Sequence, residues 1–295
     1  MGDQRIFGMF PDSDGKNQII FDPSQAASKM RQEKEAGTGV PVDGIIFDLD
    51  DTLYPQSSGF SDHRNREVAI NFMCEKLGFE SRQAAIDLRN EYFRKYHSTL
   101  KGLTVAGQEG KLPKPFREED LGDYFTENCN FEKFLKPNPH LAQQLKQLPL
   151  RKILFTNGPR RYGIRCIQAL GLSEIFPEDH IVGVENVMPY CKPDPEAFTA
   201  ILARAQLFSH RAIMVEDSMK NIRTAHSLKM RTILIDESLY TNLAGGEAAL
   251  LDDVARADDP AVDVALASIN DLYTALPELW HTPNPRFVPP PPHHK

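Results

Sequence analysis

The chain has 295 residues, of which 41% are hydrophobic and 25% charged, values that are ordinary for a globular protein of one large or two smaller domains. No apolar run approaches the roughly 20 residues that a membrane-spanning helix needs, so we expect no contact with a membrane. The net charge of −7 has the wrong sign for nonspecific binding to a nucleic acid polymer. The four cysteines form no C-x-x-C pair, and the N-terminus lacks a secretory signal. These features predict a reduced, cytoplasmic protein with small-molecule partners.

The chain begins with a polar stretch that has few apolar clusters, and we predict a flexible N-terminal tail over residues 1–41. Residues 44–48 form a short apolar, β-branched run that ends in a carboxylate, a pattern typical of a buried parallel strand. Four later segments share this pattern: 152–156, 180–184, 212–215 and 231–235. Helical patterns separate them at 162–170, 195–205 and 221–228. This alternation predicts an α/β fold with a doubly wound parallel sheet.

The stretch between the first two predicted strands is far longer than a crossover needs. Helical patterns over 64–77 and 82–95 predict an inserted, all-helical second domain at 57–137, with a loop at 104–119. The sheet domain then comprises 42–56 and 138–282, with further helices at 131–145 and 269–280. Prolines occupy positions 289–292, and we predict a Pro-rich, disordered tail over 283–295.

Polar residues stand at the carboxyl ends of the predicted strands, where open α/β sheets bind ligands. The first strand ends in Asp48 and is followed closely by Asp50, and the second ends in Thr156 and Asn157. The fourth strand is followed by Glu216 and Asp217, and Lys192 precedes that strand in a K-P-D-P loop. We expect these groups to meet at one edge of the sheet.

Such a combination suits the transfer of a phosphoryl group. A phosphomonoester carries about two negative charges at neutral pH, so a carboxylate can attack it only if cations offset the repulsion. Asp48 is the candidate nucleophile, which would form an aspartyl-phosphate that water then hydrolyses. Lys192 supplies one cation. The other is Mg²⁺, for which we expect as ligands Asp48, the main-chain carbonyl of Asp50, Asp217 and, directly or through water, Glu216.

Asp50 is the candidate acid and base, which would protonate the leaving oxygen and then activate water. Thr156, Asn157 and Lys192 are expected to hold the phosphoryl oxygens, and Gly158 lets that turn approach closely. Each residue alone has an ordinary explanation as a turn former, a solvated lysine or a helix cap. Their combination in this chain order favours catalysis.

With these residues the chain resembles the haloacid dehalogenase (HAD) superfamily of phosphatases. Its motifs match D-x-D-x-T at 48–52, Thr156, Lys192 and the acidic pair Glu216–Asp217. The resemblance implies a Rossmann-like core, Mg²⁺ and a helical cap inserted between the first and second motifs. It also implies that Asn221 helps to hold the lysine loop.

A narrower resemblance comes from D-D-T-L-Y-P at 50–55, from Y-x-x-x-Y at 92–96 followed by K-G-L at 101–103, and from L-K-P at 135–137. These segments are similar to the pyrimidine 5′-nucleotidase-like subfamily, which implies a pyrimidine nucleoside monophosphate as substrate. The cap would then set specificity. Aromatic rings can stack on a base and arginine can pair with phosphate, so the candidate cap contacts are Arg64, Tyr92, Tyr96 and His97.

Several alternatives stay open. The same core motifs would serve a phosphatase for another small metabolite, such as a sugar phosphate or pyridoxal phosphate, and the sequence does not address a phosphomutase. A dehalogenase needs neither Asp50 as an acid nor an acidic pair for Mg²⁺. A catalytically retired regulatory or binding protein would be of a different class, but the retention of Asp48, Asp50, Thr156, Lys192 and Asp217 together argues against it. The oligomeric state is undetermined.

Overall fold

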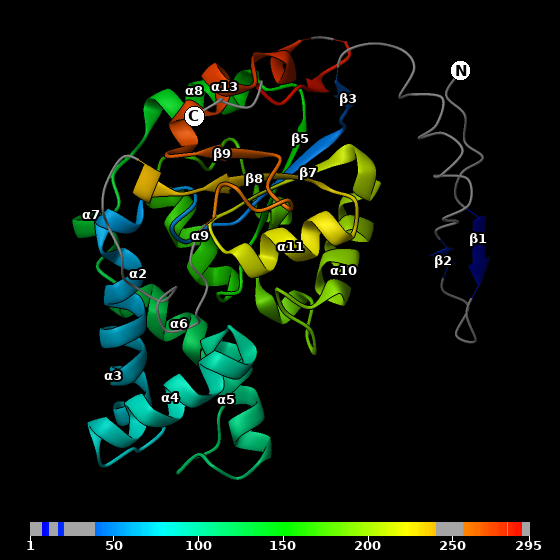
Figure 1. Cartoon of the computed structure of the whole chain (residues 1–295). Coiled ribbons are helices and arrows are strands. Elements are labelled where there is room, and N and C mark those ends of the chain that lie inside the picture. The colour runs from blue at the N-terminus through cyan, green and yellow to red at the C-terminus, as the bar shows by residue number, and fades with distance from the viewer. Residues whose placement is uncertain (1–7, 12–16, 21–38, 240–255, 282, 291–295) are drawn as a thin grey trace.

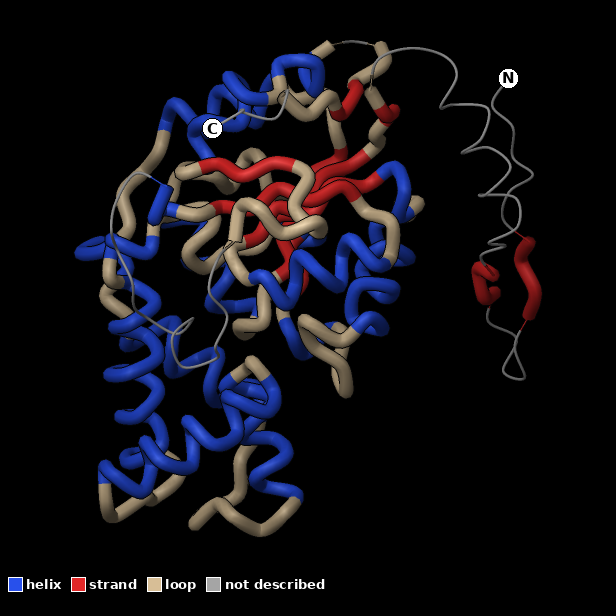
Figure 2. Tube along the Cα trace, viewed as in Figure 1, coloured by secondary structure: helices blue, strands red, loops and turns tan. Residues whose placement is uncertain are grey.

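A parallel sheet of six strands, ordered β6-β5-β4-β7-β8-β9, forms the centre of the protein (Figures 1 and 2). The structure is a computed structural model of the chain, and it describes residues 8–11, 17–20, 39–239, 256–281 and 283–290. The strands are β4 (Gly44–Phe47), β5 (Arg151–Phe155), β6 (Ile181–Val182), β7 (Ala212–Glu216), β8 (Arg231–Ile235) and β9 (Val264–Leu266). The strand order reverses between β4 and β7, so the carboxyl end of β4 lies at the switch point where such sheets bind ligands.

The sheet is buried on both faces, which explains why its strands are continuously apolar. Successive side chains of a strand point to opposite faces. Ile45 and Phe47 accordingly pack in one apolar cluster with α8 and α9, whereas Ile46 packs in another with α10. Figure 1 shows α8 and α10 on opposite sides of the sheet. The helices are α8 (Pro139–Gln147), α9 (Arg160–Ala169), α10 (Pro195–Ala205) and α11 (Met219–Ser227). The structure therefore confirms the predicted doubly wound α/β fold.

An all-helical insertion separates β4 from β5, as predicted, and α3 to α6 extend away from the sheet in Figure 1. Its elements are η1 (Gln56–Ser58), α2 (Phe60–Asp62), the π-helical η2 (His63–Val68), α3 (Ala69–Glu75), α4 (Arg82–Tyr96), α5 (Thr99–Gln108), α6 (Glu118–Asn128) and α7 (Phe131–Phe134). Local signals set the junction between α4 and α5. His97 ends α4 in the left-handed region (φ 54°), and the Ser98 side chain caps α5 by accepting from the Lys101 amide.

The loop predicted at 104–119 is shorter than expected, because α5 continues to Gln108 and α6 begins at Glu118. Leu100, Leu103 and Ala106 recur at helical spacing and are buried, and this packing outweighs the low helix propensity of the glycines. Gly102 has a packing reason, since a Cβ there would lie 3.0 Å from the Cβ of Tyr92. The loop is therefore limited to residues 109–117, between α5 and α6.

Two further predicted helices are interrupted. The helix expected over 131–145 is divided into α7 and α8 around Pro137, and the Asn138 side chain caps α8 by accepting from the Leu141 amide. The helix expected over 269–280 is broken into η7 (Ile269–Asp271), α13 (Leu272–Ala275) and η8 (Pro277–Trp280). Proline at 277 cannot continue the preceding helix. The short strand β9 was not predicted.

Short strands occur within both predicted tails. Within 1–41, β1 (Gly8–Pro11) pairs antiparallel with β2 (Asn17–Ile20). Further along, β3 (Val40–Pro41) pairs antiparallel with β10 (Arg286–Phe287), which lies in the predicted 283–295 tail. Phe287 is 1% exposed and joins the main apolar cluster, which anchors this segment. The structure also describes Gly39, 283–285 and 288–290, and the other residues of both tails lie outside the described ranges.

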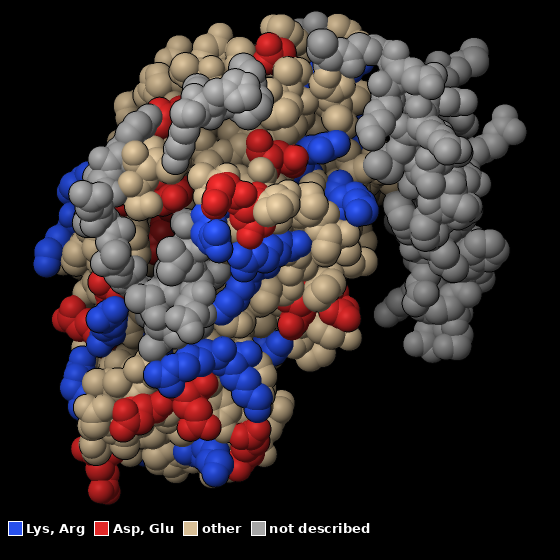
Figure 3. Space-filling view, viewed as in Figure 1, with Lys and Arg blue, Asp and Glu red and all other residues tan. Residues whose placement is uncertain are grey.

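Packing rather than cross-linking holds the molecule together. Cys74, Cys129, Cys166 and Cys191 carry free thiols. None of the helices in the described parts of the chain combines the length and apolar character needed to cross a bilayer. On the face in Figure 3, basic and acidic side chains are interspersed. Ion pairs such as Arg223 with Asp259 at 2.9 Å join side chains of opposite charge in this protein. This face differs from the continuous basic surface that binds nucleic acid backbones.

We expect Phe287→Ala to lower the free energy of unfolding by about 3 kcal/mol, because it removes a fully buried ring. Urea denaturation measures this change, and Pro289→Ala at an exposed position of the same segment is the matched control. Equal stabilities of Phe287→Ala and Pro289→Ala would show that the C-terminal segment is not anchored by this side chain.

Candidate active site

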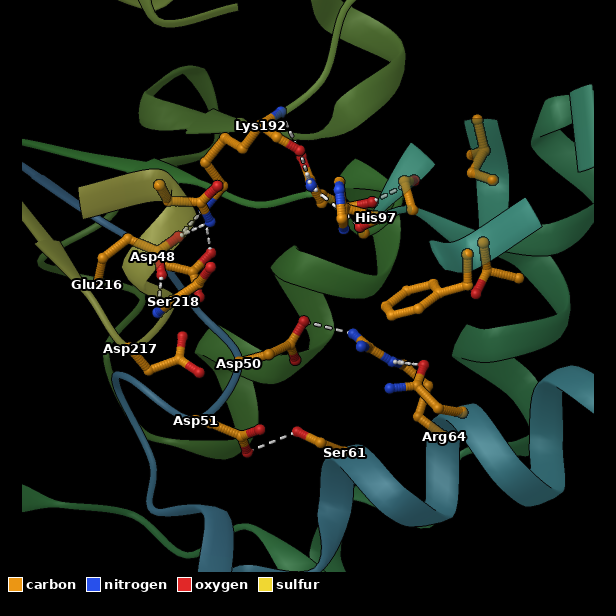
Figure 4. Close-up of a pocket in the computed structure, with 18 of the residues that line it drawn as sticks. Asp48, Asp50, Asp51, Ser61, Arg64, His97, Lys192, Glu216, Asp217 and Ser218 are labelled. Atoms are coloured by element: carbon orange, nitrogen blue, oxygen red, sulfur yellow. Dashed lines mark hydrogen bonds and ion pairs between the residues drawn. The ribbon is translucent and has the colours of Figure 1, made fainter. Parts of the chain in front are cut away.

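A pocket opens at the carboxyl edge of the sheet, between the sheet and the helical insertion (Figure 4). From the sheet side it is lined by Asp48, Asp50, Asp51, Asn157, Gly158, Pro159, Lys192, Pro193, Glu216, Asp217, Ser218, Lys220 and Asn221. From the insertion it is lined by Ser61, Arg64, Asn65, Phe93, His97, Ser98, Thr99, Leu100 and Phe125. The residues predicted at three strand ends and in the lysine loop therefore converge, except that Thr156 is not among the lining residues.

Lys192 is the most buried cation of the pocket, with an exposure of 1%. Its Nζ donates to the Asp48 carboxylate and to Oε1 of Glu216 at 2.7 Å. Burial by itself would lower the pKa of Lys192, but the two carboxylates outweigh it and raise the pKa above its ordinary value. The ammonium is therefore charged, and it lies between the ends of β4 and β7.

Glu216 serves mainly to hold Lys192 in place. Besides Lys192, its Oε1 accepts from Asn221 Nδ2 at 2.5 Å, and its Oε2 accepts from the Ser218 amide at 2.8 Å. The Thr224 hydroxyl, also on α11, donates to the Pro193 carbonyl at 2.9 Å. Asn221, the residue expected to hold the lysine loop, thus acts through Glu216, whereas Thr224 contacts the loop directly and was missed.

Asp48 belongs to a cluster of carboxylates that can bind a divalent cation. Its amide donates to the Val215 carbonyl at 2.9 Å, which places Asp48 one residue beyond the β4–β7 ladder. Oxygens of Asp48, Glu216 and Asp217 all lie within 4.8 Å of one another. Burial raises the pKa of Asp48 to about 8 although Lys192 opposes the shift, and burial followed by the Glu216 charge raises the pKa of Asp217. Such a set of hard oxygen donors fits Mg²⁺.

The Asp50 side chain lies outside this cluster, on the pocket wall between Asp48 and Arg64 (Figure 4). Its Oδ1 accepts from the hydroxyls of Tyr54 at 2.5 Å and Tyr162 at 2.6 Å, and its Oδ2 forms an ion pair with Arg64. Arg64, a predicted contact of the substrate, lines the pocket and there contacts Asp50. The two tyrosines were missed. Tyr54 stands in the D-D-T-L-Y-P segment, whereas nothing in the sequence distinguishes Tyr162.

Asp51 turns the chain away from the strand. Its backbone is left-handed (φ 60°), a conformation that aspartate tolerates better than most residues. Its carboxylate accepts from the Ser61 hydroxyl at 2.7 Å, which ties it to α2. Burial raises the pKa of Asp51 to about 7. The reversal directs the side chains of Asp50 and Asp51 to different partners (Figure 4).

Thr156 and Gly158 form a tight turn after β5. The Thr156 side chain is fully buried, and its Oγ1 accepts from the Gly158 amide at 2.9 Å. A Cβ at position 158 would lie 3.1 Å from Cδ1 of Tyr162 and 3.3 Å from Oγ1 of Thr156. A side chain at position 158 would therefore crowd this turn.

The Asn157 side chain connects three segments of the protein, which leaves its backbone amide for the predicted contact with phosphate. Its Nδ2 donates to the carbonyls of Lys192 at 2.7 Å and His97 at 3.1 Å, and its Oδ1 accepts from the Lys192 amide at 2.9 Å. The Ser98 hydroxyl in turn donates to the Asn157 carbonyl at 2.8 Å. Asn157 thereby links the lysine loop to the α4–α5 junction of the insertion.

The three remaining candidate cap contacts, Tyr92, Tyr96 and His97, differ in whether they reach the pocket. His97 lines the pocket, whereas Tyr92 and Tyr96 do not. Their rings stack on each other with centroids 6.1 Å apart, and the Tyr92 hydroxyl bonds to Glu109. Phe93, which the sequence did not single out, lines the pocket instead. A spacing of four residues identifies one helix face but not the face that meets the pocket.

Comparisons with known proteins agree with this fold. The sequence profile of the haloacid dehalogenase-like hydrolases matches residues 42–228. Phosphate metabolism protein 8 of Saccharomyces cerevisiae is 29% identical over 214 residues, which span 66% of this chain and 63% of the yeast protein. A phosphoglycolate phosphatase of Mesorhizobium japonicum is 26% identical over 197 residues, 65% of this chain and 82% of that protein. The crystal structure of CbbY from Rhodobacter sphaeroides in complex with phosphate superposes with a TM-score of 0.52 and 21% identity, covering 78% of this chain and 96% of that one.

We expect Mg²⁺ to bind more tightly as the pH rises from about 6 to about 8, and to release protons on binding. Burial raises the pKa of Asp48 to about 8, so part of the protein carries a proton on Asp48 that must leave before this side chain ligates the cation. Titration calorimetry in two buffers of different ionisation enthalpy measures the proton release, with the exposed Asp62→Asn as the control. A binding enthalpy that is the same in both buffers would contradict the raised pKa.

Replacement of Asn157 by alanine removes three hydrogen bonds between segments, so we expect residues 96–100 and 190–194 to exchange their amide hydrogens faster. Hydrogen exchange followed by mass spectrometry measures this change without any ligand. Asn128→Ala is the matched control, because the Asn128 side chain bonds only within its own helix, to the Tyr124 carbonyl. Exchange that stays as slow as in the control would contradict the role of the Asn157 side chain in linking these segments.

Proposed function

This chain belongs to the haloacid dehalogenase-like hydrolases, and we propose that it is a Mg²⁺-dependent phosphomonoester hydrolase that forms an aspartyl-phosphate on Asp48. The observation that carries the proposal is the buried Lys192 ammonium, bound to Asp48 and, at 2.7 Å, to Glu216. A cation fixed beside the attacking carboxylate offsets the negative charge of a phosphomonoester. This arrangement supports phosphoryl transfer.

In the first step an Asp48 oxygen bonds to phosphorus while the bond from phosphorus to the leaving oxygen breaks. Asp50, once protonated and released from its ion pair with Arg64, gives its proton to the leaving oxygen, so that an alcohol departs. In the second step water attacks the phosphorus of the aspartyl-phosphate and gives a proton to Asp50, which releases phosphate and restores Asp48. Lys192 and Thr156 hold the phosphoryl oxygens, and the turn of Asn157 and Gly158 contributes backbone amides.

Asp48 and Asp217 would hold Mg²⁺ through their carboxylates, and Asp50 would add its main-chain carbonyl. Both oxygens of Glu216 already accept hydrogen bonds from Lys192, Asn221 and Ser218, which favours a contact through water for this residue. When bound, the cation adds positive charge that stabilises the transferring phosphoryl group. A dehalogenase would need neither this acidic cluster nor an acid at Asp50.

For the substrate we propose first a pyrimidine nucleoside 5′-monophosphate, so that the enzyme acts in nucleotide metabolism. The segments at 50–55, 92–96 and 135–137 support this choice, as does the pocket wall of Phe93 and His97, whose rings can stack on a base. A phosphorylated hydroxy acid or carbohydrate is the second candidate. It is favoured by the relatives named phosphoglycolate phosphatase and phosphorylated carbohydrates phosphatase, the latter 24% identical and from Thermotoga maritima.

We expect phosphate release from UMP or CMP to exceed that from 2-phosphoglycolate, glyceraldehyde 3-phosphate and pyridoxal 5′-phosphate, and EDTA to abolish it. A colorimetric phosphate assay over this panel measures both effects. If another phosphate ester is hydrolysed faster, the proposed chemistry stands and the proposed substrate is wrong. If no compound of the panel releases phosphate in the presence of Mg²⁺, the result would favour a binding protein without catalytic activity.

Asp48→Asn is the blank for this assay, and we expect it to lower the rate by at least about 1,000-fold, because an amide cannot form the acyl phosphate. Asp62→Asn, an exposed carboxylate on α2, should retain activity. Borohydride reduction of the working enzyme followed by mass spectrometry locates the phosphorylated residue. Reduction at any aspartate other than Asp48 would refute the assignment of the nucleophile.

A further inference from the structure

The helical insertion forms the wall of the pocket that faces the leaving group of a substrate. In the proposed reaction the phosphoryl group lies at Asp48 and Lys192 on the sheet side, so the alcohol half of the substrate extends towards the insertion (Figure 4). Asn65 on η2 lines this wall and is only 3% exposed. The proposed chemistry gives this buried amide no role, although buried polar groups need hydrogen-bond partners.

Only the oxygen of the Asn65 amide has a partner within the protein. Arg64 Nε donates to Asn65 Oδ1 at 3.0 Å, and because a guanidinium nitrogen can only donate, the amide must turn its oxygen towards it. Arg64 is itself held by its ion pair with Asp50. Among the described residues, none accepts a hydrogen bond from Asn65 Nδ2. The Asn65 side chain therefore offers the pocket a fixed donor.

The first turn of α5 adds donors to the same wall. Ser98, Thr99 and Leu100 all line the pocket. The Ser98 hydroxyl oxygen accepts from the Lys101 amide at 3.4 Å, whereas the amides of Thr99 and Leu100 have no acceptor in the described parts of the chain. Such amides at a helix N-terminus also carry partial positive charge. Two separate helices of the insertion thus present N–H groups to one space.

The acceptors at this junction are already engaged. The His97 carbonyl accepts from Asn157 Nδ2 at 3.1 Å, and the Asn157 carbonyl accepts from the Ser98 hydroxyl at 2.8 Å. The rings of Phe93 and Phe125 complete the lining from the insertion. This wall therefore offers mainly donors and apolar surface. It suits a leaving-group oxygen that only accepts, because a hydroxyl group would also bring a proton that needs an acceptor.

We propose that Asn65 is a specificity-determining residue that binds, together with the first amides of α5, a carbonyl or carboxylate oxygen of the leaving group. The proposal rests on the proposed function, because it concerns the substrate of that reaction. Two sources share this chemistry, namely a carbonyl of a pyrimidine base and the carboxylate of a hydroxy acid. A site built to bond one polar group rejects a compound that lacks it, because the buried donor is then left unpaired.

Two matched pairs of esters test the proposal. UMP is compared with methyl ribofuranoside 5-phosphate, which lacks the base, and 2-phosphoglycolate is compared with ethyl phosphate, which lacks the carboxylate. The measured quantity is the ratio of kcat/KM for the acceptor-bearing ester to kcat/KM for its partner. Effects on the phosphoryl chemistry that both members share cancel in this ratio. A change in it therefore reports contacts with the part of the leaving group in which the two members differ.

Asn65→Asp is the most informative variant, because it keeps an oxygen for Arg64 Nε and replaces only the donor nitrogen by an acceptor. We expect the ratio to fall about 10- to 100-fold in at least one pair. Asn65→Ala should lower the same ratio without adding a charge. Asn71→Asp is the matched control, since Asn71 Oδ1 also accepts from an arginine, Arg82 at 2.6 Å, but lies outside the pocket, and both ratios should stay unchanged.

The pair that responds identifies the source of the oxygen. A fall in the UMP pair indicates a base carbonyl, and a fall in the phosphoglycolate pair indicates a carboxylate. Equal losses on both members of each pair would show that Asn65 only supports Arg64, and this result or unchanged ratios would overturn the proposal and leave the proposed function intact. A wild-type enzyme that hydrolyses other phosphates but neither acceptor-bearing ester would also overturn it. Inactivity on every phosphate would instead contradict the proposed function itself.

Discussion

The active site depends on one buried cation, the ammonium of Lys192. A lone charge in the protein interior is strongly unfavourable, and several carboxylates placed together repel one another. The pairing of Lys192 removes both penalties, because its Nζ binds Asp48 and, at 2.7 Å, Glu216. The ammonium is then no longer a lone charge, and it offsets the repulsion between the carboxylates. The end of β4, the end of β7 and the lysine loop must therefore converge for any one of them to be stable. Contacts from Asn157, Asn221 and Thr224 hold that convergence in place.

The helical insertion takes part in the same arrangement instead of only covering it. Its η2 helix supplies Arg64 to Asp50, and its α4–α5 junction is bound by Asn157 through the His97 carbonyl. A third link joins Lys101 on α5 to Asp194 beside the lysine loop, at 2.9 Å. A change in the position of the insertion would thus reach both the proposed acid and the buried lysine.

The sequence predicted best the elements whose signals are local. The strand at 231–235 and the helix at 195–205 occur with the predicted bounds, because an apolar run and an amphipathic pattern are decided within the segment itself. The sequence predicted poorly those segments whose structure depends on packing against distant parts of the chain. β9 exists because it pairs with β8, Phe287 is ordered because the main apolar cluster receives it, and α5 tolerates two glycines because Tyr92 and Leu112 pack against them.

By itself the sequence determined which chemical groups stand at the strand ends and in what order, since Asp48, Thr156, Lys192 and Glu216 follow short apolar runs or precede a helix. Parallel topology then brings such groups to one edge, whatever the details of packing. Only the tertiary structure decided their partners. Arg64 faces Asp50, the Asn157 side chain binds the lysine loop, and Phe93 reaches the pocket where Tyr92 and Tyr96 do not. The physical reason is that the direction of a side chain follows from the packing of its helix against distant segments, which no local pattern records.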